Sequence, residues 1–330
     1  MNMPARSWRI YLGIVLSLAG LYLAIRQVDP AQALAAFTRA NYELVGVAAG
    51  IQLMVLGVIA ARWQRLFPAR PEFRRLLGPL LIAHLANSVL PVRLGILIRA
   101  YLVGTREGIS KALVLGTTLA EKVFDSLTFV LLFVTLVPFV APGWFHWSAL
   151  PMSTGVFLTL FPAMVLVTYQ RRRFLSLAHA LLRWVPGSDR LVMSERLEAG
   201  LEGLSRLEGT RSVALLWLWT LLIVGLGALV NWVTMLAFGI RVPPVAAVFL
   251  LVALQMGGRI PAPLGGIGVF QYICVKALSF FGVDAHLALS FGFVLQFVAF
   301  VPGSLLGAFY LYREHESLHR LRTAVKERER

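Results

Sequence analysis

Glu121, Lys122 and Asp125 lie together inside a long apolar stretch of the sequence, residues 112–140. Charged side chains are costly in such a stretch, and they usually pair with one another or serve a function. Because residues four apart share one face of a helix, the carboxylates of Glu121 and Asp125 point the same way and Lys122 borders them. The spacing predicts a pair of acids that can hold an arginine supplied by an interrupted helical segment.

The other charges expected at membrane depth are all basic: Arg93, Arg99, Arg259 and Lys276. Together with Lys122 they outnumber the two acids, which leaves positive charge for a ligand. Planar guanidinium groups suit phosphate oxygens. We therefore predict an anionic ligand, a phospholipid head group or a polyprenyl phosphate. Arg93 and Arg259 are expected to contact its phosphate, with Arg99 and Lys122 beside them and Glu121 and Asp125 as organisers.

A purely structural interpretation of these charges stays open. Intramembrane charges often pair only to fix a helical bundle, and the long side chains of Arg99 and Lys276 can reach a membrane surface. Asn87 and Gln296 are polar residues in apolar surroundings, which is typical of hydrogen bonds between membrane helices. Asn87 is also a candidate organiser of the site because it begins an interrupted segment.

Two stretches break the helical pattern inside apolar sequence, Asn87–Gly95 and Gly257–Gly268. The second has five glycines and two prolines in twelve positions. Non-helical backbone survives at membrane depth only where protein or a water-filled cavity surrounds it, so both stretches are predicted to line a site. An ordinary extramembrane loop is the alternative. The residues expected to act as backbone gates are Pro91, Gly95, Pro261, Pro263, Gly265, Gly266 and Gly268.

The composition predicts an all-α polytopic membrane protein with a single integral membrane domain. Of 330 residues, 58% are hydrophobic and only 14% are charged, and the mean hydropathy is +0.76. The two broken regions, residues 76–103 and 245–281, have halves too short to span a bilayer and are predicted to be re-entrant hairpins. Six full crossings are expected, at residues 10–25, 44–61, 112–140, 150–169, 212–238 and 286–312.

The net charge of +15 is attributed to orientation in the membrane and not to nucleic acid. Basic residues collect between the apolar spans, in a cluster of Arg62, Arg65, Arg70, Arg74 and Arg75, in the loop 170–211 and in the tail 313–330. Positive loops are cytoplasmic, so both termini are expected inside. The hairpins then enter from opposite sides, which makes an inverted repeat with a midplane site the working hypothesis.

No enzyme chemistry is predicted. Cys274 is the single cysteine, the histidines show no ligand spacing, and Gly265–Gly268 lacks the Lys-Ser/Thr of a phosphate-binding loop. We expect no metal and no cofactor. A membrane-embedded transferase acting on a lipid-linked sugar is disfavoured, since no acid pair lies near a plausible sugar-nucleotide site.

Three motifs carry a resemblance to a known family. They are Asn87 with Pro91-Val-Arg93-Leu-Gly95 and Arg99, then Glu121-Lys-Val-Phe-Asp125, and finally Pro263-Leu-Gly-Gly-Ile-Gly268 followed by Phe281-Gly-Val283. Over about residues 8–313 the chain resembles the flippase-like transmembrane domain of lysylphosphatidylglycerol synthases and of many stand-alone inner-membrane proteins.

The resemblance implies lipid translocation in the bacterial inner membrane, in a stand-alone form without the soluble aminoacyl-transferase domain. Two positions depart from the family pattern, since Ile96 and Gln271 stand where glutamates are common. Gln271 is included among the expected substrate contacts, and loss of both acids makes the expected cavity more positive. A membrane scaffold that docks a cytoplasmic lipid- or glycan-modifying enzyme is the alternative function. A homo-oligomer is left open.

Overall fold

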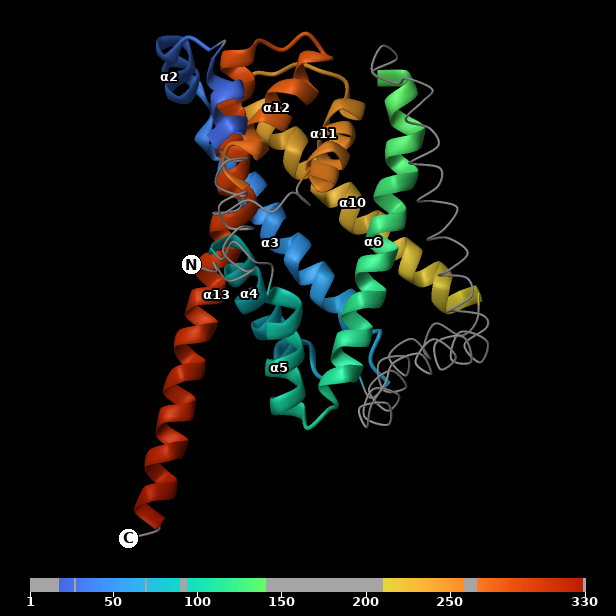
Figure 1. Ribbon diagram of the computed structural model, residues 1–330, viewed down its shortest axis with the longest axis vertical. Helices are drawn as coiled ribbons and strands as arrows, with labels where there is room; N and C mark the ends of the chain where they lie inside the picture. The colour runs from blue at the N-terminus through green and yellow to red at the C-terminus, as the bar shows by residue number, and fades with distance from the viewer. Residues whose placement is uncertain are drawn as a thin grey trace, which may run out of the picture.

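The computed structural model describes residues 18–26, 28–68, 70–89, 94–140, 210–257 and 266–328, with the side chains of residues 123, 210, 211, 213 and 314–328 excepted. All regular structure in these ranges is helical. Residues 18–25 form a helix, and the further helices are α2 (Pro30–Arg39), α3 (Tyr42–Gln64), α4 (Phe73–Val89), α5 (Gly95–Glu107), α6 (Lys111–Val140), α10 (Thr210–Ala237), α11 (Pro244–Gly257), α12 (Val269–Ser279) and α13 (Ala285–Arg328). Figure 1 shows their arrangement.

Four described helices, α3, α6, α10 and α13, are long and apolar enough to cross a membrane. They coincide with four of the six predicted crossings. Large apolar side chains on them face outward, among them Phe139 with 86% of its surface exposed, as expected where lipid replaces water. The chain is a multi-pass membrane protein. The crossing predicted at 150–169 and most of the loop 170–211 lie outside the described residues.

Both predicted breaks separate pairs of short helices. The α4 and α5 helices flank residues 90–94, and α11 and α12 flank residues 258–268. Figure 1 shows α4 and α5 in the lower part of the helix bundle and α11 with α12 in the upper part, so the two pairs lie in opposite halves of the bundle.

Two helical segments differ from the sequence expectation. The connection after the first span contains α2, whose first turn begins with Pro30 and is capped by the Asp29 side chain. Proline at the first helical position behind an aspartate cap is a standard start signal. The last predicted span, 286–312, matches the candidate membrane span Ala285–Arg313, and α13 itself continues beyond it through the charged tail to Arg328.

The long helices pack in two extensive pairs, α3 with α10 and α4 with α13. The first pair is antiparallel: the backbone N–H of Asn41, before α3, donates to the carbonyl of Ala237 at the end of α10 at 2.8 Å. In the second pair, Gly303 and Gly307 let α13 approach α4 closely. A Cβ at Gly307 would lie 2.3 Å from the Leu81 carbonyl oxygen, so only glycine fits this small-xxx-small contact.

The apolar core forms two main clusters. One joins α3, α10, α11, α12 and α13 around Met235, Leu250 and Phe291. The other joins α3, α4, α5 and α6 around Trp63, Leu80 and Leu127. Each pair of short helices therefore packs into its own cluster, and α3 contributes to both.

Candidate functional site

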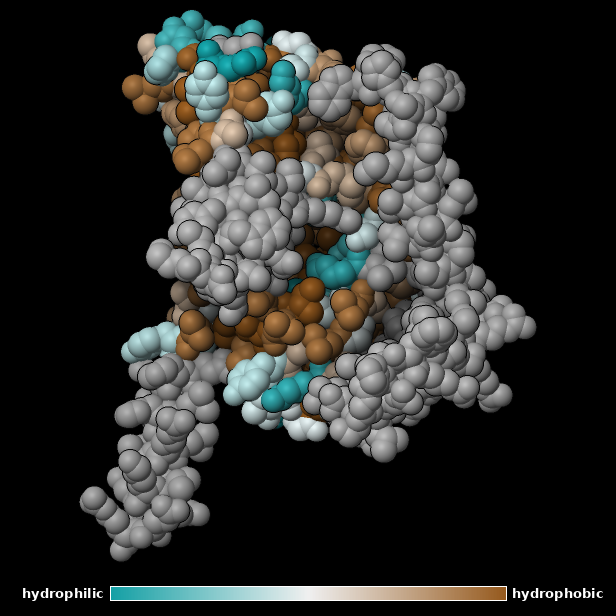
Figure 2. Space-filling model, in the orientation of Figure 1, coloured by the Kyte–Doolittle hydropathy of each residue, from teal (hydrophilic) through white to brown (hydrophobic). Residues whose placement is uncertain are grey.

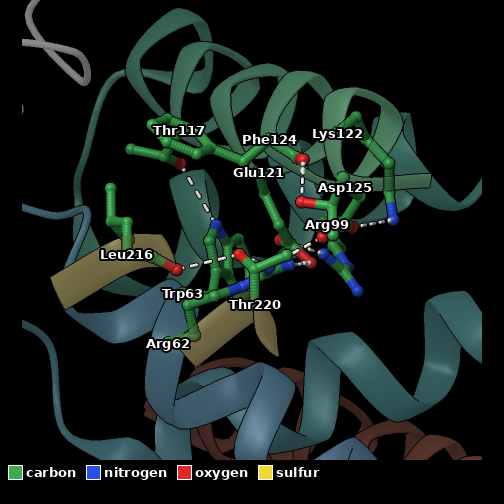
Figure 3. A network of polar contacts seen from close by, with 11 residues as sticks. Arg62, Trp63, Arg99, Thr117, Glu121, Lys122, Phe124, Asp125, Leu216 and Thr220 are labelled. Carbon is green, nitrogen blue, oxygen red and sulfur yellow. Dashed lines mark hydrogen bonds and ion pairs between the residues drawn. The ribbon is translucent and has the colours of Figure 1, made fainter. Parts of the chain in front are cut away.

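The centre of the polar site is the guanidinium group of Arg62, in the last turn of α3. Its Nη1 donates to Oδ1 of Asp125 at 2.6 Å and to Oγ1 of Thr220, on α10, at 2.8 Å. Its Nη2 lies 3.2 Å from Oε1 of Glu121, an ion-pair distance without hydrogen-bond geometry. Thr220 in turn donates to the Leu216 carbonyl. One arginine thus ties α3 to α6 and α10, as Figure 3 shows.

Glu121 has a second arginine partner from α5. Its Oε2 accepts a hydrogen bond from Nη1 of Arg99 at 3.0 Å. The Arg99 guanidinium also lies over the indole of Trp63, 5.0 Å from the ring centroid, a cation–π arrangement. The indole Nε1–H of Trp63 donates to Oγ1 of Thr117 at 3.1 Å. The acid of α6 and the aromatic ring of α3 together orient Arg99.

The three cations of the site differ in their access to the surroundings. Exposure of the side chain is 2% for Arg62 and 12% for Arg99. Lys122, whose Nζ lies 3.5 Å from Oδ2 of Asp125, has a side chain 51% exposed. With Glu121 and Asp125 these residues carry a net charge of +1. The exposed fraction of the cationic side chain rises from Arg62 to Arg99 to Lys122. We call Arg62, Arg99, Glu121, Lys122 and Asp125 the charge network.

The network lies on the lower half of α6, and the surface near that height is hollowed. Figure 2 shows hydrophilic atoms in a hollow at mid-height of this face, with brown apolar surface above and below it. Hydrophilic surface otherwise gathers at the top, over α2, and at the lower end. A polar hollow with apolar surface above and below it is the kind of site that accepts a charged group at membrane depth.

Arg62 also has an unused donor. Its Nε is buried and has no hydrogen-bond partner among the described residues, and Oε1 of Glu121 is likewise buried without one. Buried polar atoms are normally satisfied. The five side chains are therefore held together by attraction between opposite charges more than by a complete set of hydrogen bonds. A change of partners within the network breaks fewer hydrogen bonds than it would in a fully hydrogen-bonded cluster.

The helix after each break begins with a backbone N–H that donates to a carboxamide, from α4 in the first case and from α12 itself in the second. The backbone N–H of Gly95, at the start of α5, donates to Oδ1 of Asn87 at 2.9 Å. The backbone N–H of Gly268, before α12, donates to Oε1 of Gln271 at 2.7 Å. In each case an uncharged carboxamide satisfies a backbone donor at a helix N-terminus, which would otherwise be an orphan.

The predicted site residues separate into two groups. Arg99, Lys122, Glu121 and Asp125 are brought together in the charge network. The residues Arg93, Arg259, Pro91, Pro261, Pro263 and Gly265 lie outside the described residues, so their roles stay predictions. Gly266 and Gly268 have φ of 83° and 94°, a backbone conformation that favours glycine.

Gln271 is completely buried and donates from Nε2 to Oε1 of Gln296, on α13, at 2.6 Å. The expectation that Gln296 bonds between helices is confirmed. Gln271 caps α12 and joins it to α13, so any contact with substrate requires these bonds to open. Asn87, by contrast, is exposed. Lys276 is exposed in the last turn of α12, away from the charge network.

The assignment of Arg62 to the cytoplasmic basic cluster is wrong. The residue is 1% exposed and belongs to the helix that we expected to end at residue 61. Two acids in one helical face need more than one cation, and the adjacent Trp63 continues the apolar run. Those two signals could have identified Arg62 as an interior residue.

A separate concave surface lies between α4, α5 and α13. It is an apolar groove of about 690 Å³ whose lining includes Ile82, Leu97, Tyr101 and Leu311. Leu97 and Tyr101 lie on the face of α5 away from Arg99, because residues two apart point to different sides of a helix. The same short helix thus carries a charged inner face and an apolar outer groove.

Comparison with known proteins identifies the family. Residues 10–307 match the family described as "Lysylphosphatidylglycerol synthase TM region". The chain belongs to this family. The matched range contains every member of the charge network and both breaks, so the family region and the candidate site coincide.

One curated relative is the protein named "Glycosyltransferase AglD" of Haloferax volcanii, which is 30% identical over 151 residues. That match covers 44% of this chain and 24% of the relative, so the chain spans about a quarter of the length of the relative it matches. No solved structure matches the chain. Within the described residues, no three His, Cys, Asp or Glu side chains gather as metal ligands would.

Proposed function

We propose that the protein moves an anionic lipid across the membrane by holding its head group at arginines between two re-entrant hairpins. The observation that carries this proposal is the charge network, with a net positive charge and increasing exposure from Arg62 through Arg99 to Lys122. An arginine fork and a half-exposed ammonium group suit a phosphate. Arg93 and Arg259, at the two breaks, are proposed to complete the contacts.

The arrangement of the short helices supports translocation in particular. Two interrupted helical pairs at opposite ends of a membrane bundle are the pattern of transporters that expose one site alternately to each side. The halves of each pair are short helices, and a carboxamide accepts a backbone hydrogen bond at the start of the second half in both pairs. We propose that α4–α5 enters from the cytoplasm and α11–α12 from the other side, with both termini cytoplasmic.

A lipid substrate is supported by two further observations. The family name refers to a synthase of lysylphosphatidylglycerol, which is a phospholipid. The apolar groove between α4, α5 and α13 lies beside the same hairpin and offers space for an acyl chain. We therefore propose a phospholipid or a polyprenyl-phosphate-linked lipid as substrate, and the bacterial inner membrane as the location. No catalytic role is proposed.

A second function is favoured by one comparison. The relative named as a glycosyltransferase contains the matched region as only 24% of its length. A related membrane region can therefore be part of a larger protein with an enzyme name. On this proposal the chain is a scaffold or accessory subunit that docks a cytoplasmic lipid- or glycan-modifying enzyme, and a homo-oligomer is compatible with either function.

The test is transport in vesicles reconstituted with the full-length protein. Fluorescent phosphatidylglycerol in one arm and fluorescent phosphatidylcholine in another are distributed over both leaflets, and a membrane-impermeant reductant then bleaches the outer leaflet. We expect phosphatidylglycerol to be bleached beyond the outer-leaflet fraction only when the protein is present. Arg99→Ala, Arg93→Ala and Arg259→Ala should each slow this movement at least ten-fold.

Arg65→Ala is the matched control. Arg65 is an exposed arginine on the same part of the chain, stacked on Trp219 outside the charge network. Its loss should leave transport unchanged. Transport that is unaffected by all three arginine substitutions would contradict the site, and an absence of transport for every lipid would favour the scaffold.

A further inference from the structure

We propose that Arg62 is the permanent counterion of Glu121 and Asp125, so that Arg99 can exchange between Glu121 and the phosphate of a bound lipid. This inference rests on the proposed function for its ligand. It assigns different tasks to two arginines that contact the same carboxylate. Arg62 stays in place, and Arg99 is the exchangeable contact.

The two arginines differ first in how many groups hold them. Arg62 contacts Asp125, Glu121 and Thr220, which come from two helices other than its own. Withdrawing it would leave two carboxylates, one of them completely buried, without this partner. Glu121 would then depend on Arg99 alone and Asp125 on the exposed Lys122 alone, and breaking a buried ion pair by removing one partner is strongly destabilising. Arg62 therefore cannot leave the site during a transport cycle.

Arg99 has a different set of contacts. It contacts one oxygen of Glu121 and the face of Trp63. When it moves away, Glu121 keeps its ion pair with Arg62, in which Oε1 of Glu121 lies 3.2 Å from Nη2 of Arg62 and neither atom has another hydrogen-bond partner among the described residues. The acid thus remains compensated, which makes departure of Arg99 affordable in free energy.

The remaining charge fits one phosphate. The two acids and Arg62 carry a net charge of −1, and Arg99 with Lys122 brings the network to +1. A single phosphodiester bears one negative charge and would bring the occupied network to neutrality. The lipid class favoured by this balance is therefore a monoanionic phosphodiester such as phosphatidylglycerol, and Glu121 supplies the competing carboxylate that lets it leave again.

Trp63 provides a direct readout of the exchange. Its ring carries the Arg99 guanidinium in the resting arrangement, so release of Arg99 changes the charge next to the indole. The experiment titrates the purified full-length protein in detergent with short-chain dihexanoyl phosphatidylglycerol and records tryptophan emission. The same titration of Trp63→Phe isolates the contribution of this residue from that of the other seven tryptophans.

The expected result is a saturable emission change in the wild type that is absent in Trp63→Phe and in Arg99→Gln. Arg65→Gln should titrate as the wild type does. In Glu121→Gln the resting partner of Arg99 loses its charge, so the half-saturating lipid concentration should fall at least three-fold. Asp125→Asn removes the same charge from a residue that contacts Arg62 and Lys122, so it is the control for simple charge attraction, and the exchange requires a larger fall in Glu121→Gln than in Asp125→Asn. Arg99→Lys, which keeps the charge, should retain binding with at least a three-fold higher half-saturating concentration.

Four outcomes would overturn the inference. They are equal lipid-dependent stabilisation of wild type and Arg99→Gln against thermal unfolding, unchanged or weaker binding in Glu121→Gln, an equal response to dihexanoyl phosphatidylcholine, and an equal response to inorganic phosphate. None of these requires transport. The exchange can thus fail while vesicles still translocate lipid, and vesicles can fail to translocate while the exchange is observed.

Discussion

Nη1 of Arg62 lies 2.6 Å from Oδ1 of Asp125, which joins the last turn of α3 to the middle of α6 inside the membrane bundle. We predict that Arg62→Met lowers the free energy of unfolding by about 3–5 kcal/mol, because it removes the buried cation that Glu121 and Asp125 share and leaves the buried Glu121 with Arg99 alone. Thermal unfolding in detergent measures the change. Arg65→Met is the control and should cost less than about 1 kcal/mol. Equal losses in the two variants would contradict the role of Arg62.

The same pair allows a compensation test. Arg62→Met combined with Glu121→Gln removes one charge of each sign, so the double variant should be more stable than Arg62→Met alone. Coupled residues commonly show interaction energies of about 0.5–3 kcal/mol. Strict additivity of the two single variants in the same unfolding measurement would show that the ion pair contributes nothing.

The close contact between α4 and α13 predicts that the stability of the protein depends strongly on glycine at position 307. Gly307→Ala should destabilise the protein by about 1–3 kcal/mol, because the new methyl group meets the Leu81 backbone carbonyl and neither helix can yield locally. Gly57→Ala on α3 is the matched control, since nothing lies within 4 Å of its added Cβ. It should stabilise by about 0.5–1 kcal/mol through helix propensity. Thermal unfolding that ranks the two variants in the opposite order would refute the close contact.

The carboxamide acceptors at the starts of α5 and α12 predict parallel effects. Asn87→Leu and Gln271→Leu each remove the acceptor for a backbone N–H, which costs about 1–3 kcal/mol for a buried donor. Gln271→Leu should be the more harmful because it also removes the bond to Gln296. Hydrogen exchange at the first turns of α5 and α12 measures the local effect. Unchanged protection in both variants would contradict a stabilising role of these two hydrogen bonds.

If the two hairpins enter the membrane from opposite sides, cysteines placed in the two breaks should be labelled from opposite sides. With Cys274 replaced by alanine, single cysteines at Val92 and Ala262 should react with a membrane-impermeant maleimide from different sides of the membrane. Cys274 itself is buried, so its removal is a precaution against background labelling. If both positions react only from the same side, the inverted repeat is wrong.

Asp29 gives a prediction for pH. Its carboxylate caps α2 by accepting from the Ala31 backbone N–H at 2.9 Å and from the Gln32 amide, and mainly the Ala31 bond holds the pKa of Asp29 below its usual value. Because the folded-state pKa is depressed, the stabilisation is present above the unfolded value of about 3.9 and is lost as pH falls through the folded value. Hydrogen exchange over residues 30–39, corrected for intrinsic rates, should rise below that pH in the wild type. Asp29→Asn should show no such step.

The positions of the breaks and of four crossings were predictable because hydropathy and helix-breaking residues act locally. The partnership of Glu121 with an arginine from an interrupted segment was also predictable, and it is confirmed for Arg99. Arg62 was missed because a charge at the end of an apolar run has the same local signature whether it faces the cytoplasm or another helix. Its burial depends on Glu121, Asp125 and Thr220, which lie 59 to 158 positions away in the sequence.

The close approach of α13 to α4 could not be predicted in the same way. The Gly303 and Gly307 spacing signals a small-residue contact, but many helices could receive it. Only the folded chain identifies Leu81 and His84 as the residues opposite these glycines. The hydrogen bonds of Asn87 to Gly95 and of Gln271 to Gly268 could not be predicted either, since the sequence does not indicate which backbone N–H each carboxamide accepts from.

The glycine contact between α13 and α4 also distinguishes α4 from α5, the two helices on either side of the first break. Gly78, Leu81 and His84 fasten α4 to α13 along nearly two turns, which makes α4 a fixed strut. The α5 helix is joined to it through the Asn87 bond to Gly95 and carries Arg99 opposite α6. Because α5 also packs along α4 and against α6, Arg99 stands on a helix that is supported from two sides, so the exchange proposed above requires its side chain, and not the helix, to change partner.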